Sequence, residues 1–151
     1  MKKLEQLLSN IEGAMPNNER INLSVSKSSV GWHVEHMLLT INAVINELKK
    51  DNMAKYKGTF SIRKLYVFAF EKIPRGKAKA PDIVVPLKFN EETLQTHLAN
   101  TKSNLQNINT INKHNYFPHP YFGHIKVKPA IKFLAIHTIH HLKIIDDILA
   151  N

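Results

Sequence analysis

Apolar residues recur at three- and four-residue steps through four long segments of the 151-residue chain, and this spacing constrains its fold more than any other feature. On a helix, residues spaced in this way form one continuous stripe that a neighbouring element has to cover. The serines of segment 26–29 and the Asn90-Glu91-Glu92 sequence supply helix start signals. The spacing predicts long helices over about 1–13, 30–50, 90–112 and 127–149, and a shorter aromatic-rich helix over 61–73.

The segments between these helices are rich in residues that break regular structure. Three prolines and Gly76 predict a loop from Pro74 to Pro86, with a brief extended piece at 83–85 that is too isolated to form a sheet. Segment 114–124 is expected to be a connector rich in proline and aromatic residues. The expected fold class is therefore all-α: a four-helix bundle with a short accessory helix and long connecting loops, in a single domain over residues 1–151.

The composition excludes several kinds of site. The chain has no cysteine, so a metal would have to be held by histidines and carboxylates. No apolar run approaches the roughly 20 residues of a membrane span. The N-terminus begins like a secretory signal, but Glu5, Asn10 and Glu12 interrupt the apolar region that a signal would need. We therefore expect a cytoplasmic protein that does not enter the membrane.

The formal net charge of +9 raises the question of a nucleic-acid partner. Only three of the 21 basic residues are arginine, the side chain best suited to bidentate contacts with phosphates and bases. Lysine, asparagine and isoleucine together account for 49 residues, a bias typical of AT-rich coding sequences. Since the lysines are also scattered, nucleic-acid binding is disfavoured.

His137 and His141 are the most informative polar residues in the chain. Four residues apart on the predicted last helix, they lie in the middle of its apolar face, while His140 lies on the shoulder of that face. Each buried imidazole needs a partner for its acceptor nitrogen, because an unpaired buried polar group is costly. The pair is therefore either two satisfied core histidines or part of a metal site, because one divalent cation would satisfy both.

A third ligand is available on the second predicted helix, where His33 and His36 lie about one turn apart. Either of them can face inward, and the sequence does not choose between them. Glu35 is assigned to the polar arc of the same helix, and His97 is interpreted as a surface residue. The connector histidines, at 114, 119 and 124, are expected to face solvent, with His119 as one that can border a pocket.

Two stretches resemble the DinB/YfiT-like superfamily of helical bundles. They are GWHVEHMLLTINAVI, over 31–45, and HPYFGHIKVKPAIKFLAIHTIHHLKII, over 119–145. The H-P-x-F-G element before the last helix resembles one DinB-related subfamily in particular. The resemblance implies a divalent metal (zinc, nickel, iron or manganese) held by His36, His137 and His141, with His33 as the alternate ligand. It also implies a homodimer, since relatives often form one.

A metal held by three neutral imidazoles would act as a Lewis acid and lower the pKa of a bound water or thiol. The resemblance implies a metal-dependent enzyme of the thiol S-transferase or hydrolase type that acts on a small molecule. Arg75 and Lys77, in a basic loop, and His119 are the expected substrate contacts. The alternatives are a non-catalytic binding or stress-associated bundle, and a basic protein that binds an anionic partner.

Overall fold

The computed structural model describes residues 2–50, 53–77 and 79–150. Within them the chain is mostly helical and carries one small two-stranded antiparallel sheet. Several positions covered by the sequence predictions lie outside the described residues. Among them are Met1 of the predicted first helix, Ala78 of the predicted loop, and Asn151 at the end of the predicted domain. The helices are α1 (Lys2–Ala14), α2 (Val30–Leu48), α3 (Ile62–Phe70), α4 (Glu91–Gln106) and α5 (Val127–Leu149), and the strands are β1 (Tyr116–His119) and β2 (Gly123–Lys126).

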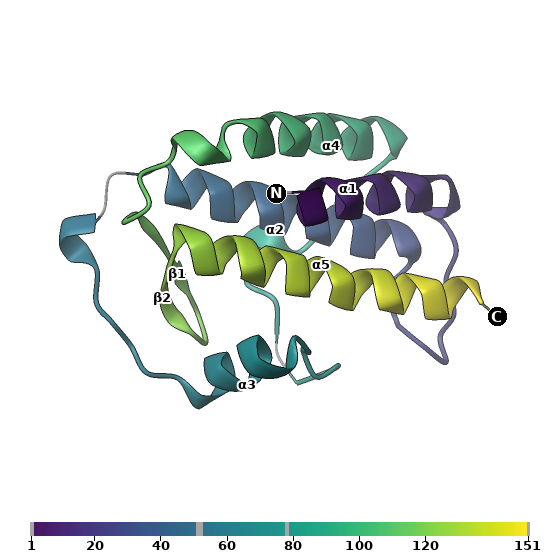
Figure 1. The fold of residues 1–151 in the computed structure, drawn as a ribbon. Helices are drawn as coiled ribbons and strands as arrows, with labels where there is room; N and C mark the ends of the chain where they lie inside the picture. Colours follow the sequence, from purple (N-terminus) through teal and green to yellow (C-terminus); the bar gives the residue numbers. More distant parts are fainter. Residues whose placement is uncertain (1, 51–52, 78, 151) are drawn as a thin grey trace.

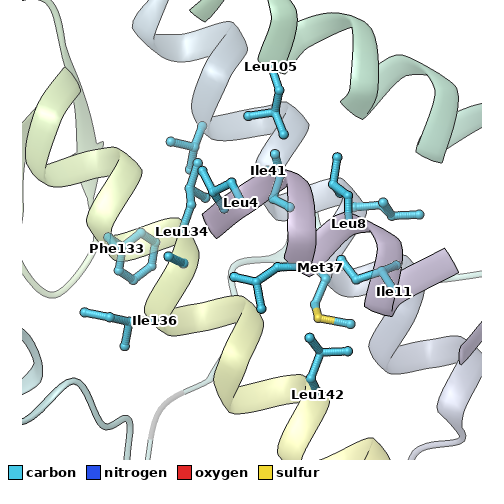
Figure 2. Close-up of a cluster of buried hydrophobic side chains, with 14 of the residues drawn as sticks. Leu4, Leu8, Ile11, Met37, Ile41, Leu105, Phe133, Leu134, Ile136 and Leu142 are labelled. Carbon is cyan, nitrogen blue, oxygen red and sulfur yellow. The ribbon is translucent and has the colours of Figure 1, made fainter. Parts of the chain in front are cut away.

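Four of the helices, α1, α2, α4 and α5, lie side by side, and α3 lies apart from them (Figure 1). The long helix α2 packs against both α4 and α5, and α1 also contacts α4 and α5. The shared core is built from the apolar stripes that the sequence spacing predicted. Figure 2 shows Leu4, Leu8 and Ile11 of α1, Met37 and Ile41 of α2, Leu105 of α4, and Phe133, Leu134, Ile136 and Leu142 of α5.

The connector before α5 is not irregular, which corrects the prediction that the chain has no sheet. Strands β1 and β2 pair with Phe117 opposite Ile125 and His119 opposite Gly123. Gly123 has φ of +69°, the left-handed conformation that glycine adopts without strain. A Cβ atom there would also collide with the side chain of Thr59. The H-P-x-F-G element thus forms the turn of a hairpin whose second strand leads directly into α5.

Three other predicted boundaries differ from the structure. Helix α4 ends at Gln106, and a 3-10 turn over Ile108–Thr110 follows where the apolar spacing had suggested continued helix. Helix α3 is shorter than predicted because Glu71 takes up a left-handed conformation, with φ of +49°. The predicted extended piece at 83–85 is largely replaced by a 3-10 turn over Asp82–Val84.

Candidate functional site

The start of α2 places two histidines in the interior. The Ser29 side chain accepts a hydrogen bond from the Trp32 backbone N–H and so caps the helix just before Val30. His33 and His36 follow in the first two turns, and each side chain is only 4% exposed. Both histidines therefore face inward, whereas the sequence could not tell which one would.

Helix α5 supplies the facing pair. His141 is buried, and His137 is partly buried with a fully buried Nδ1 atom that has no hydrogen-bond partner among the described residues. The two rings lie one turn apart, with centroids separated by 4.6 Å. This confirms that the pair lies on the inward face of α5. In isolation, however, a helical pair of imidazoles defines only part of a metal site.

His36, His137 and His141 come together between α2 and α5. One ring nitrogen from each residue can be chosen so that all three lie within 4.8 Å of one another. The Nε2 atoms of His36 and His137 are 3.2 Å apart. Two nitrogens at about 2.0–2.1 Å from one tetrahedral ion would lie roughly 3.3–3.4 Å apart, so this separation suits a shared ion. The three histidines are therefore close enough to hold a metal ion.

The carbonyl of Val84 fixes which nitrogen of His36 faces this cluster. His36 Nδ1 lies 2.7 Å from that carbonyl oxygen, which can only accept a hydrogen bond. Nδ1 therefore carries the proton of the neutral ring, and Nε2 presents its lone pair toward His137. Such a hydrogen bond from the far nitrogen is the usual way in which a ligating histidine is oriented. Nothing in the sequence links Val84 to His36, because only tertiary contact brings them together.

His33 lies behind the three-histidine cluster instead of within it. Its Nδ1 atom is 3.0 Å from Nδ1 of His141, and its Nε2 atom is 3.0 Å from the Ser26 hydroxyl. When Ser26 accepts a hydrogen bond from His33 Nε2, His33 Nδ1 can accept one from His141. That arrangement leaves Nε2 of His141 unprotonated. The geometry thus gives His33 a supporting position, which sequence spacing alone could not distinguish from a ligand position.

Burial keeps these imidazoles uncharged. Desolvation, followed by repulsion from His36 and other nearby charges, lowers the pKa of His33 to about 4. Desolvation is also the main cause that lowers the pKa values of His36, His137 and His141, and neighbouring histidines lower those of His137 and His141 further. At neutral pH the cluster therefore offers lone pairs to a cation, as a metal ligand must.

The cluster opens into a cavity of about 1080 Å³ whose wall includes His36, His137 and His141. The expected substrate contacts, Arg75, Lys77 and His119, line the same cavity. Arg75 is exposed and lies 2.7 Å from Asp147, with which it forms an ion pair. The structure thus brings the basic loop to the three-histidine cluster, although Arg75 is 39 residues from His36 and 62 residues from His137 in the sequence.

His119 forms part of an aromatic wall. Its ring stacks on Phe122 with centroids 4.1 Å apart and meets Phe133 edge-on at 4.8 Å. Its Nδ1 atom accepts a hydrogen bond from the Tyr121 backbone N–H. Burial, with a smaller contribution from Lys64, lowers the pKa of His119 to about 4. His119 is consequently a neutral polar group among apolar aromatic side chains, and it borders the cavity, as the sequence allowed for this histidine.

Two of the residues that line the cavity, Trp32 and His140, were not identified from the sequence. Trp32 stacks on His36, with centroids 5.1 Å apart and planes 15° from parallel. His140, placed only on the shoulder of α5 by the helical wheel, lines the cavity together with Ile73. The helical positions of both residues were visible in the sequence, but their access to a cavity depends on the loop that packs over α5.

Glu35 lies on the polar arc of α2, as predicted, but this arc packs against α4. Glu35 is 3% exposed, and its Oε1 atom lies 2.8 Å from Nδ1 of His97 on α4. His97 is partly buried and therefore not a simple surface residue. On the same arc, Asn42 donates a hydrogen bond to the His97 carbonyl and accepts one from Asn104. The polar stripe of α2 is thus the contact between α2 and α4.

Comparison of the chain with protein family models, with curated proteins and with solved structures gave no match. Across the part of the chain that the structure describes, every helix is too short or too polar to cross a membrane. The function of the chain is therefore inferred from the geometry of the three-histidine cluster and its cavity.

Proposed function

We propose that the protein is a DinB-like four-helix bundle that binds one divalent metal ion through His36, His137 and His141. The observation that carries this proposal is the meeting of three neutral imidazoles, one from α2 and two from α5, at the wall of a large cavity. The 3.2 Å between the Nε2 atoms of His36 and His137 suits a shared ion, and the Val84 carbonyl supports the orientation of His36. Zinc, nickel, iron and manganese are the metals to test.

The proposed activity is that of a metal-dependent enzyme, of the hydrolase or thiol S-transferase type, acting on a small molecule in the cavity. A divalent cation held there would supply Lewis acidity toward a substrate oxygen or sulfur. The protein itself supplies the neutral ligands, the cavity that surrounds the substrate and Trp32, which holds the His36 ring by stacking. Three protein ligands leave at least one coordination position for substrate, as is usual in catalytic sites.

His140 is the residue we assign to proton transfer. It lines the cavity next to His141 but is not one of the three proposed ligands. Burial, then the nearby Arg75 charge, lowers its pKa, so its ring is neutral at pH 7. A neutral imidazole has one nitrogen with a free lone pair, which is able to accept a proton from a nucleophile.

The test begins with metal content, measured by elemental analysis of protein purified without a polyhistidine tag. We expect about one divalent ion per chain in the wild type and its loss in His36→Ala, His137→Ala and His141→Ala. His114→Ala is the matched control, because this histidine is exposed and lies outside the cavity. If the wild type binds none of the four metals in equilibrium dialysis, the metal site is disproved.

The enzyme proposal needs a second measurement on metal-loaded protein. Panels of small esters and of thiol-plus-electrophile pairs should reveal turnover that chelators abolish. His140→Gln should keep the metal and lose about 100-fold or more in kcat, the typical contribution of a general base. Metal binding without turnover of any panel member would favour the non-catalytic binding protein instead.

A further inference from the structure

The interior of the cavity is predominantly apolar. Aliphatic and aromatic side chains from α2, α3, α5, the hairpin and the loop before α4 form most of its wall. Its volume of about 1080 Å³ is slightly larger than the usual range for small-molecule sites. The apolar lining residues include Val44, Val67, Phe117, Phe122, Phe133 and Ile144. A ligand that fills this space must therefore present a large apolar surface.

The mouth of the cavity exposes apolar side chains to water. Ile62 and Tyr66 on α3 and Ile83 in the facing loop all line the cavity, yet Ile83 is 78% exposed and Ile62 is 73% exposed. Exposed apolar side chains gathered at a concave opening are typical of ligand-binding surfaces. The apolar surface thus continues from the interior to the rim, so that an elongated apolar group could pass from one to the other.

The charges at the rim are mostly positive. The lining residues include Arg63, Arg75, Lys77 and Lys79, and the single carboxylate among them, Glu47, forms an ion pair with Lys50. Arg75 is partly neutralised by Asp147. Lys77 and Lys79 are exposed and form no ion pair with another described residue. The histidines inside are neutral, so the fixed positive charge of this cavity lies at its opening.

We infer that the ligand of this cavity is a single-chain anionic amphiphile: an apolar chain that lies in the interior, with one carboxylate, sulfate or phosphate group held at the rim by Lys77 and Lys79. The apolar chain then reaches toward the three histidines, and in a substrate of the proposed enzyme it would carry there the ester or other electrophilic group on which a bound cation would act. This inference names the substrate class for the proposed enzyme and so depends on that proposal for its functional meaning. Binding itself requires only the cavity and the rim, and can be measured without metal.

The experiment is isothermal titration calorimetry on chelator-treated, metal-free protein of the full chain. The probes are dodecanoate and dodecyltrimethylammonium, each below its critical micelle concentration, and acetate. We expect dodecanoate to bind at least tenfold more tightly than the cationic probe, and acetate to give no measurable binding. Equal binding of the two dodecyl probes would refute the rim assignment, and equal binding of acetate and dodecanoate would refute the apolar interior.

Matched variants locate the two halves of the site. The double variant Lys77→Gln/Lys79→Gln should weaken dodecanoate binding about three- to tenfold, as expected for the loss of two exposed charges. The control variant Lys113→Gln/Lys143→Gln removes the same net charge outside the cavity and should leave the binding unchanged. Ile83→Ser should weaken binding at least twofold, whereas the control Leu87→Ser, which removes an even more exposed apolar side chain outside the cavity, should leave it unchanged. Equal effects of test and control variants would overturn the proposed location.

A vesicle arm separates a soluble single-chain amphiphile from a lipid surface. Lys77- and Lys79-dependent sedimentation with phosphatidylglycerol vesicles, but not with phosphatidylcholine vesicles, and without binding of free dodecanoate, would overturn the single-chain assignment in favour of a membrane surface. Binding of free dodecanoate without sedimentation would assign the ligand to a soluble molecule of the same chemistry. Absence of both would disprove the inference. Metal content, measured separately before chelation, tests the three-histidine proposal independently.

Discussion

The Nδ1 atoms of His33 and His141 lie 3.0 Å apart, although 108 residues separate the two histidines in the chain. The contact joins α2 to α5 directly behind the three-histidine cluster, and Ser26 extends it on the far side of His33. When Ser26 accepts a hydrogen bond from His33 Nε2, His33 Nδ1 accepts one from Nδ1 of His141 and leaves Nε2 of His141 unprotonated. This makes His33 a positioning residue for the proposed metal site.

Replacing His33 by leucine should consequently weaken metal binding about 10- to 100-fold without abolishing it, the usual effect of losing a partner that orients a ligand. Competition with a chromophoric chelator measures this affinity. His33→Asn is the informative companion, because an amide oxygen near the Nδ1 position can still accept the hydrogen bond from His141. The positioning role would be refuted by a His33→Leu protein with wild-type affinity.

The buried pair Glu35 and His97 should contribute to the stability of the α2–α4 contact. His97→Ala leaves the 3%-exposed Glu35 carboxylate without this partner, and we expect a loss of about 1–3 kcal/mol in the free energy of unfolding. Urea denaturation measures the loss. Adding Glu35→Leu to His97→Ala should recover part of it, because the buried polar group is then removed. A double variant less stable than the single one would contradict this account.

The close packing at the start of α2 can be tested at Gly31, with Gly13 of α1 as the control. A Cβ atom on Gly31 would lie 2.5 Å from the Phe89 ring and 2.9 Å from the Asn18 backbone oxygen, whereas one on Gly13 would meet nothing within 4 Å. Gly31→Ala should therefore lower the free energy of unfolding by about 1–3 kcal/mol. Gly13→Ala should instead raise it by up to about 1 kcal/mol, because alanine is the better helix former. Thermal and urea unfolding should show a loss of stability for Gly31→Ala and a gain for Gly13→Ala. A change of the same sign in both variants would argue against the close approach at Gly31.

The stability of the metal-free protein should fall as the pH is lowered from about 6.5 to 4. Burial lowers the pKa of His119 to about 4, so this residue is neutral in the folded chain over that range and becomes protonated in the unfolded chain near its ordinary pKa of 6.5. The unfolded state then binds more protons, and the contribution of His119, complete above pH 6.5, is progressively lost down to pH 4. His119→Phe should reduce the loss in free energy between pH 7 and pH 4.5 by up to about 3 kcal/mol. Urea titrations at several pH values provide the measurement, and a His119→Phe protein with the wild-type pH profile would contradict this assignment.

Helical periodicity explains why part of the site could be predicted. His137 and His141 are four residues apart, and any α-helix places such residues on one face, whatever packs against it. The apolar stripes likewise specified where α1, α2, α4 and α5 would form. The hairpin was missed because Pro118 and Pro120 disfavour a sheet in general, although proline is tolerated on an edge strand, and a two-stranded sheet has only edges.

The amino-acid sequence by itself determined the helices, their apolar faces, the pair on α5 and the restriction of any metal site to histidine and carboxylate ligands. These follow from local geometry and side-chain chemistry, which do not depend on distant residues. The tertiary structure alone decided that His36 joins the pair while His33 supports it, and that Glu35 is buried against His97. It also brought Val84 and the basic loop to the cavity. The reason is that the rotation of α2 about its axis, and the path of the loop over α5, depend on how all the elements pack together.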